Sequence, residues 1–308
     1  MANAHCETVV VGAGIFGLDV ALVLAEKGFG SSVSVVAEYL PGDTAPDYTS
    51  PWFVISASAC AFVDPTVLTS VSEPVLPAEK LPRGTKFGVS FTTFTINAPK
   101  HIEYLYHRLK HQYGVSFTRQ KLPNIQAAFS DPSIKRVFNC TGNAARTLPG
   151  VQDTACYPTR GQVVLAKASN VQTNMMRHGR DYETYIIPRP HSNGNVVLGG
   201  FMQKGNSDVA TYSHDTRDIL GRTRQLIPEL YESKLDVIAA FAGLCPSRVG
   251  GARVERTTAT VSRSKRPIIH NYGAGGTGFQ AGYGMAVEAV GLAQDILREF
   301  QAGHRARS

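Results

Sequence analysis

A glycine-rich turn between a short apolar strand and an apolar helix, close to the N-terminus, constrains the fold most strongly. The run Thr8-Val9-Val10-Val11 is β-branched, which is the composition of a strand buried in a parallel sheet. Apolar residues from 18 to 25 have the spacing of one helix face, and Gly28 ends that helix. The turn between strand and helix is a complete GxGxxG, formed by Gly12, Ala13, Gly14, Ile15, Phe16 and Gly17.

Each glycine of this turn has its own physical role. Gly12 allows the tight turn, Gly14 lets the backbone approach a pyrophosphate, and Gly17 lets helix and strand pack closely. The N-terminus of the helix offers free N–H groups to the phosphates. A second strand, residues 32–36, leads to Glu38, whose carboxylate can accept hydrogen bonds from an adenosine ribose. The combination predicts a dinucleotide site that fits FAD and NAD alike; the alternative is a tight turn followed by a surface glutamate.

The composition is that of a soluble globular protein. Of the 308 residues, 43% are hydrophobic and 18% are charged. No apolar run reaches the roughly 18 to 20 residues of a membrane span, and residues 1–8 lack the features of a secretory signal. The net charge of +7 is scattered along the chain without a nucleic-acid motif. We therefore expect neither a nucleic acid nor a membrane as a partner.

The cysteines and histidines form no metal-binding pattern. The five cysteines are odd in number, widely spaced and without a CxxC pair, which favours reduced thiols inside a cell. The nine histidines are dispersed and include no HExxH pair. We therefore expect no metal site. The cysteines are Cys6, Cys60, Cys140, Cys156 and Cys245.

Further along the chain, helices alternate with strands, and the second half becomes rich in strands. This order predicts an α/β fold in which a Rossmann-like nucleotide-binding layer is interleaved with a mostly antiparallel sheet. The Asn193-Gly194 pair is a strong signal for a hairpin turn. The expected strands are residues 87–96, 115–118, 135–139, 162–167, 184–188, 196–200, 234–244 and 268–272, and the expected helices are residues 99–113, 216–226 and 286–300.

A second glycine-rich turn, residues 273–278, lies between the strand at 268–272 and the helix expected at 286–300. The N-terminus of a helix at this place can stabilise negative charge, and reduced flavin carries such charge at the pyrimidine edge of its ring. The alternative is a flexible loop before a terminal helix.

Several segments resemble D-amino-acid oxidases and D-aspartate oxidases, particularly the fungal members, in the same chain order. The most specific are the RGQ, YIIPRP and HNYGxGGxG motifs. The matching segments are residues 10–17, 49–52, 139–142, 160–162, 185–190, 198–200, 243–244, 253–255 and 269–279. The resemblance covers most of the chain except residues 53–83.

The resemblance implies an FAD-dependent oxidase that converts a D-amino acid to a 2-oxo acid, ammonia and hydrogen peroxide. In this family hydride passes directly from the substrate Cα to the flavin, so the protein needs no strong base. The resemblance also implies two domains: an FAD-binding domain, residues 1–50, 97–160 and 255–308, and a substrate-binding and interface domain, residues 51–96 and 161–254. It implies D-amino acid and dioxygen as small-molecule partners and allows a homodimer.

The peroxisome is the usual location of the family. The ending Arg305-Ala306-Arg307-Ser308 lacks an SKL-type signal, so localisation rests on the resemblance alone, with the cytoplasm as the alternative.

The resemblance also assigns roles to individual residues. Tyr185 corresponds to the tyrosine that hydrogen-bonds the substrate carboxylate, and Gly276 to the residue whose carbonyl receives the substrate amine. The alternatives are an ordinary strand aromatic and a simple turn glycine. Cofactor contacts beyond the GxGxxG turn and Glu38 fall on Tyr39, Thr49 and Ser50, on Gly142 and Asn143, and on Gly275, Gly276, Thr277, Gly278, Phe279 and Gln280.

Two departures from the family pattern concern the reacting part of the site. The family holds the substrate carboxylate with an arginine in a GLRP or GFRP segment, where this chain has Cys245. A cysteine cannot replace a planar, charged fork. Arg248 is a candidate substitute, and Met202 stands where many fungal members have a second site tyrosine.

The second departure follows Trp52, where Phe53 and Val54 replace small residues that lie beneath the flavin ring in the family. The chain is also shorter than the family pattern there by a few tens of residues, either through a deletion or through a gene-model error. These departures leave two further hypotheses open: a catalytically impaired paralogue that retains the flavin fold, and a flavin amine oxidase whose substrate has no carboxylate.

Overall fold

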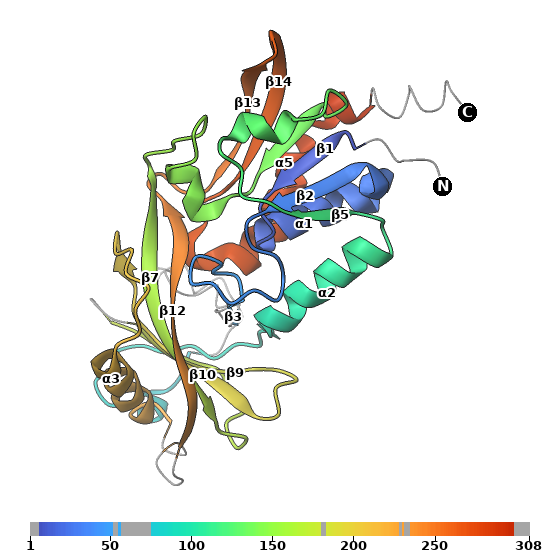
Figure 1. The fold of residues 1–308 in the computed structure, drawn as a ribbon. Coiled ribbons are helices and arrows are strands. Elements are labelled where there is room, and N and C mark those ends of the chain that lie inside the picture. The colour runs from blue at the N-terminus through green and yellow to red at the C-terminus, as the bar shows by residue number, and fades with distance from the viewer. Residues whose placement is uncertain are drawn as a thin grey trace.

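The computed structural model describes residues 6–51, 55–56, 75–179, 183–227, 230 and 235–298. A mostly parallel sheet with helices and a separate antiparallel sheet form the two parts of the molecule, seen at the upper right and lower left of Figure 1. This architecture confirms the predicted fold class. The expectations on Trp52, Phe53 and Val54 lie outside the described residues. In the described part of the chain no helix is both long and apolar enough to span a membrane.

The parallel sheet has the strand order β13-β14-β6-β1-β2-β5, with β13 antiparallel to β14 and the others parallel. β1 lies in its interior, so Val10 is paired with Val35 on one side and Phe138 on the other. The strands are β1 Thr8–Val11, β2 Val33–Ala37, β5 Ser116–Arg119, β6 Arg136–Asn139, β13 Arg253–Val261 and β14 Ser264–Tyr272.

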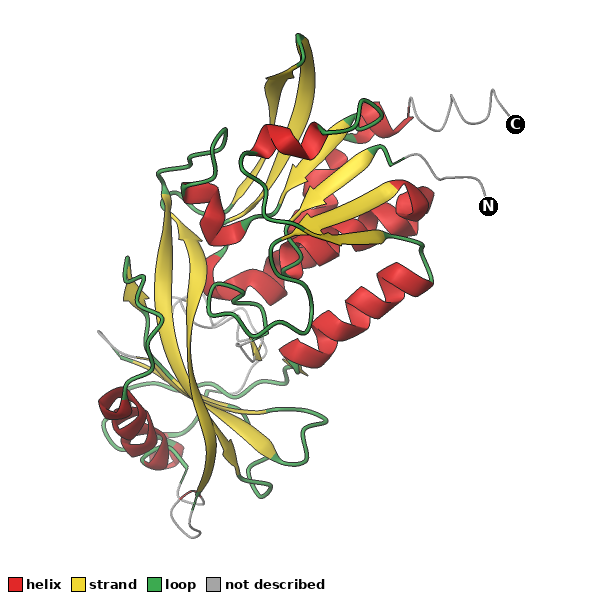
Figure 2. Ribbon diagram, in the orientation of Figure 1, coloured by secondary structure: helices red, strands yellow, loops and turns green. Residues whose placement is uncertain are grey.

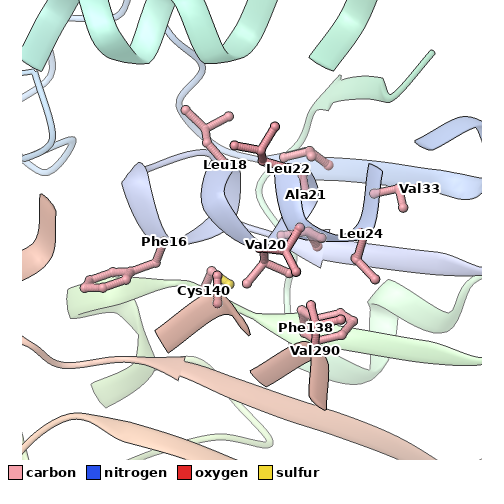
Figure 3. Packing of buried hydrophobic residues seen from close by; sticks show 14 of the residues in the cluster. Phe16, Leu18, Val20, Ala21, Leu22, Leu24, Val33, Phe138, Cys140 and Val290 are labelled. Carbon is pink, nitrogen blue, oxygen red and sulfur yellow. The ribbon is translucent and has the colours of Figure 1, made fainter. Parts of the chain in front are cut away.

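Three helices accompany this sheet: α1 (Ile15–Leu24), α2 (Ala98–His111) and α5 (Gly278–Gly291). Every residue of α1 is buried because it packs against the sheet, α2 and α5. Figure 3 shows α1 side chains directed both towards and away from Phe138 and Val290. Shorter helical turns are Ala25–Phe29, Gly30–Ser32, Ala78–Lys80, Ile125–Phe129, Gly142–Arg146 and Gly275–Thr277.

The second sheet has the order β11-β7-β10-β9-β8, and β12 also pairs with β7. The helix α3 (Ser213–Arg224) packs its Ile219 against Ile186 and Leu198 of this sheet. β7 and β12 pair along almost their whole lengths and extend towards the parallel sheet (Figure 2). The strands are β7 Cys156–Lys167, β8 Met175–His178, β9 Glu183–Pro188, β10 Asn195–Gly199, β11 Gln203–Lys204 and β12 Asp236–Arg248; β3 Ile55–Ser56 pairs with β4 Thr95–Ile96 elsewhere.

Most of the expected elements are confirmed, including the hairpin turn at Asn193 and Gly194, which both have positive φ. The strand expected over residues 87–96 is wrong: only Thr95–Ile96 is a strand there, with an isolated bridge at Val89. The irregular alternation of that segment supplies no continuous apolar face for a neighbouring strand. Phe87 and Phe94 are accordingly exposed.

The C-terminal helix begins at Gly278, eight residues before the predicted start at 286. Its first half contains three glycines, which disfavour helix on propensity alone. Packing explains at least one of them, because a Cβ at Gly282 would lie only 2.5 Å from Oδ2 of Asp19 in α1. Close contact between α1 and α5 therefore overrides the local propensity.

Asp19 is a carboxyl group within this helix contact, only 5% exposed, and burial raises its pKa from the usual 3.8 to about 7. Because the folded pKa is the higher one, the charged form destabilises the fold. The stability that Asp19 contributes in its protonated form is fully present below about pH 4 and is lost as the pH rises to about 7. Above about pH 7 the loss no longer grows. Between pH 5.5 and 8 the loss is about 2 kcal/mol.

The variant Asp19→Asn should lack this loss. We expect its stability relative to the wild type to increase by about 2 kcal/mol between pH 5.5 and pH 8, measured by urea unfolding. The exposed Asp236→Asn serves as the control and should show no such change. Equal pH profiles for Asp19→Asn and the wild type would contradict the prediction.

Candidate active site

A cavity of about 860 Å³ lies where the first strands of the parallel sheet end, next to β12. In open α/β sheets, ligands bind outside the carboxyl ends of the strands, so the position fits a nucleotide. The GxGxxG turn after β1 lines one part of the cavity, and Gly275, Gly276, Gly278 and Phe279 line another. The remaining lining comes from Val11 and from residues 36–39, 47–50, 120–123, 140–144, 147–149 and 245–246.

Most of the residues predicted from the sequence lie in this lining. They are Gly12, Ala13, Gly14, Ile15, Phe16, Glu38, Tyr39, Thr49, Ser50, Gly142, Asn143, Cys245, Gly275, Gly276, Gly278 and Phe279. The cavity therefore brings together residues from both ends of the chain. Predicted residues outside the lining are Gly17, Thr277, Gln280, Tyr185, Met202 and Arg248.

Two glycines of the GxGxxG turn, Gly12 and Gly17, have no room for a side chain. Gly12 has a φ of +107°, and a Cβ there would lie 2.4 Å from the carbonyl oxygen of Cys140. A Cβ at Gly17 would lie 1.9 Å from the carbonyl oxygen of Gly12. Both positions thus require glycine, for the turn and for helix packing respectively.

The N-cap residue of α1 is Gly14, which has no side chain that could accept hydrogen bonds from the first turn. The backbone N–H groups at this helix end therefore face the cavity region. Ser50 Oγ accepts one hydrogen bond from the Ile15 N–H at 3.1 Å. Such donors, together with the partial positive charge of a helix N-terminus, have the chemistry that stabilises a phosphate group.

Two of the predicted cofactor residues anchor β12 at the edge of the cavity. The carbonyl oxygen of Leu244 accepts hydrogen bonds from Thr49 Oγ1 at 2.6 Å and from Asn143 Nδ2 at 2.7 Å. Asn143 Oδ1 is buried and has no hydrogen-bond partner among the described residues. Since a buried acceptor without a partner is costly, this oxygen fits a donor from a bound ligand.

Glu38 and Lys121 both line the cavity, and the Glu38 carboxylate forms an ion pair of 2.9 Å with Lys121 Nζ. Lys121 belongs to residues 120–123, which follow β5 and line the cavity. Neither these residues nor residues 147–149, which also line the cavity, were predicted from the sequence. Neither segment carries a motif. Their position after strands of the parallel sheet is the only signal that points to them.

Tyr185 lies on β9, with its ring against the backbone of Gly199 and Gly200. A Cβ at Gly199 would lie 2.0 Å from the ring, so the paired glycines make room for the tyrosine. Burial raises the pKa of the Tyr185 phenol, and nearby Cys245 raises it further. The phenol is therefore neutral at physiological pH. Met202, in contrast, is 61% exposed.

Cys245 is a free cysteine that lines the cavity, and burial raises the pKa of its thiol to about 12. The thiol therefore stays protonated and neutral at physiological pH. It supplies no positive charge for a carboxylate.

Arg248 belongs to a separate network at the junction of the two sheets. Its Nε donates to Asp153 Oδ2 at 2.9 Å, and Asp153 also accepts from Arg253 and Tyr272. Burial opposes the charged form of Asp153, but the bonds from Arg248 and Tyr272 hold its pKa below the usual value. Arg248 is thus held by a carboxylate of the protein itself.

The profile of the FAD-dependent oxidoreductase family (DAO) matches residues 64–292. The chain belongs to this family, and its cofactor is FAD. It is 38% identical to a D-amino-acid oxidase of Schizosaccharomyces pombe, over 94% of this chain and 97% of the relative. It is also 33% identical to a D-aspartate oxidase of Cryptococcus neoformans var. grubii, over 70% of this chain and 66% of the relative.

The alignment with the Schizosaccharomyces pombe relative spans 341 positions, more than the 308 residues of this chain, so it includes positions at which this chain has no residue. Among solved structures, the glycine oxidase from Geobacillus kaustophilus has a TM-score of 0.71 at 15% identity and covers 94% of each chain. That likeness concerns the fold.

Proposed function

We propose that the protein oxidises D-amino acids to 2-oxo acids, with water and dioxygen consumed and ammonia and hydrogen peroxide released. The observation that carries the proposal is that one cavity joins the GxGxxG turn to Gly276 and Cys245. A dinucleotide and a small substrate can therefore meet there. The two relatives that act on D-amino acids or D-aspartate, by their names, support this substrate class.

The residues present fit FAD. The backbone donors at the N-terminus of α1 and the hydroxyl of Ser50 would hold the pyrophosphate, and Glu38 the ribose. Asn143 Oδ1 provides a free acceptor for the adenine side. Residues 275–280 would contact the flavin edge. Bound FAD supplies the hydride acceptor, so the protein's task is to bind and orient the substrate.

The substrate is held by neutral groups in this proposal. The protonated phenol of Tyr185 donates a hydrogen bond to the carboxylate, and the Gly276 carbonyl accepts one from the amine. Cys245 offers a neutral thiol in place of a charged fork. Substrate affinity should accordingly be low, because the carboxylate has no ion-pair partner at this position.

The neutral thiol of Cys245 also favours a second candidate function, a flavin amine oxidase for a substrate without a carboxylate. The same observation fits a catalytically impaired paralogue that retains the flavin fold. All three functions require the flavin cavity, and they differ only in which substrate, if any, is oxidised.

Anaerobic reduction of the bound flavin separates these functions. The purified yellow protein is mixed with D-alanine, D-aspartate, their L-enantiomers or a simple amine, and the visible flavin absorbance is followed. We expect bleaching by D-enantiomers alone, with hydrogen peroxide formed when air is admitted. Bleaching only by the amine would support the amine oxidase. Flavin that no compound bleaches would indicate the impaired paralogue.

Three finer expectations remain part of the proposal. The chain is expected to divide into an FAD-binding domain, residues 1–50, 97–160 and 255–308, and a substrate-binding domain formed by the remaining residues. It is also expected to act in the peroxisome and to form a homodimer. Limited proteolysis, microscopy of a tagged chain and light scattering test these points in turn.

A further inference from the structure

A second cavity, of about 370 Å³, lies at the hairpin that joins β9 to β10. It is separate from the flavin cavity, and the two share no lining residue. Most of its wall is the hairpin itself, residues 188–195, and the rest is Thr95, Val171 and Gln172. No Asp or Glu is among these lining residues.

Arg189 is the charged residue in this wall. Its Nε is buried without a hydrogen-bond partner, and no ion pair to its guanidinium occurs among the described residues. Burial lowers the pKa of Arg189, and no carboxylate in the described part of the chain opposes this effect. A guanidinium stays charged inside a protein, so a positive charge is partly withdrawn from water here without a counter-charge.

Two more cations lie at the same hairpin. Lys100 Nζ donates to the carbonyl oxygen of His191 at 2.6 Å, and Lys167 Nζ donates to that of Asn193. Both ammonium groups also fix the hairpin backbone, as does Asn97, whose Nδ2 donates to the Pro190 carbonyl at 2.8 Å. The hairpin is therefore both positively charged and held in place.

We propose that this cavity is a binding site for a small oxyanion, a carboxylate or a phosphate group, held by the guanidinium of Arg189. A planar guanidinium matches these anions with paired hydrogen bonds, and the cavity has room for a small molecule around it. The site is independent of the flavin cavity and of the reaction proposed there.

Without an anion, the partly buried charge of Arg189 destabilises the fold. Arg189→Gln should therefore raise the melting temperature of the anion-free protein slightly, whereas an arginine with an ordinary stabilising role would lower it. With an anion, the wild type should be stabilised and the variant should not.

The experiment measures the melting temperature of the flavin-bound full chain in acetate or in phosphate, against sodium chloride at equal ionic strength. We expect a rise of about 2 °C or more for the wild type, with an unchanged flavin spectrum, because the flavin cavity is not involved. The rise should be lost in Arg189→Gln, retained in part in Arg189→Lys, and intact in the matched control Arg217→Gln, an exposed arginine of α3.

A rise of the melting temperature in acetate alone identifies a carboxylate site, and a rise in phosphate identifies a phosphate-binding site. Equal responses of Arg189→Gln and the wild type would overturn the proposal, as would a response to neither anion.

Discussion

Replacing Arg160 with methionine is expected to reduce the free energy of unfolding by about 3–5 kcal/mol, because the buried carboxylate of Asp215 loses its arginine partner and keeps only the exposed His214 beside it. Arg160 is 1% exposed, and its Nη1 lies 3.3 Å from Oδ2 of Asp215 in α3. The same guanidinium donates to Gln203 Oε1 at 2.9 Å and to the Ala210 carbonyl at 2.6 Å. The residue thus joins β7, the segment after β11 and α3.

Urea unfolding at neutral pH measures this loss, and a double-mutant cycle isolates the pair. The double variant Arg160→Met with Asp215→Leu should be less destabilised than the sum of its single variants, since neither charge is then buried alone. Arg217→Met on the exposed face of α3 is the control and should change stability by less than about 0.5 kcal/mol. If Arg160→Met reduced the free energy of unfolding no more than the control Arg217→Met does, the prediction would be contradicted.

The RGQ motif therefore has a structural explanation. Gln162, its third residue, donates from Nε2 to the Tyr212 carbonyl and to Thr216 Oγ1, while its Oε1 accepts from the Tyr212 N–H. Its Oε1 also accepts from Arg160. Arginine and glutamine together hold the start of α3 against β7, which accounts for the motif without a catalytic role.

How far the sequence predicts the fold depends on whether the signal is local. The turn from Gly12 to Gly17 was predicted because adjacent residues carry both the conformation and the packing requirement. The network of Asp153, Arg248 and Tyr272 was not, because its members come from distant segments and meet only through the pairing of β12 with β7 and of β13 with β14. Long-range pairing of this kind leaves no periodicity in the sequence.

The strand β13 illustrates the same limit. Its sequence from Arg253 to Val261 is largely polar, and its side chains are mostly exposed or half-buried. A strand at the edge of a sheet needs few apolar residues, so hydrophobic alternation does not reveal it.

In the candidate site, the positions of Thr49 and Asn143 came from the family resemblance, and the structure adds their shared acceptor, the Leu244 carbonyl.

The largest effect on activity is expected from Cys245→Arg. The hydrogen bonds from Thr49 and Asn143 fix the backbone of Leu244, the residue before Cys245. Because Cys245 lines the cavity, a longer side chain at this position has space to extend into the cavity. An arginine at this position would pair its guanidinium with a substrate carboxylate, an interaction worth several kcal/mol when desolvated. Since about 1.4 kcal/mol corresponds to a factor of ten, kcat/KM for D-amino acids should increase by about 100-fold or more.

The comparison with Cys245→Lys tests whether geometry or charge produces this gain. Lysine supplies the same charge as a point donor and lacks the planar fork, so its gain should be clearly smaller. The increase should be confined to substrates that have a carboxylate, and a simple amine should be oxidised no faster by Cys245→Arg than by the wild type. Steady-state peroxide production measures all three proteins, with flavin content determined from the absorbance of each preparation. An equal gain for the amine would show that Cys245 does not face the carboxylate, and no gain for any substrate would place the carboxylate site elsewhere in the cavity.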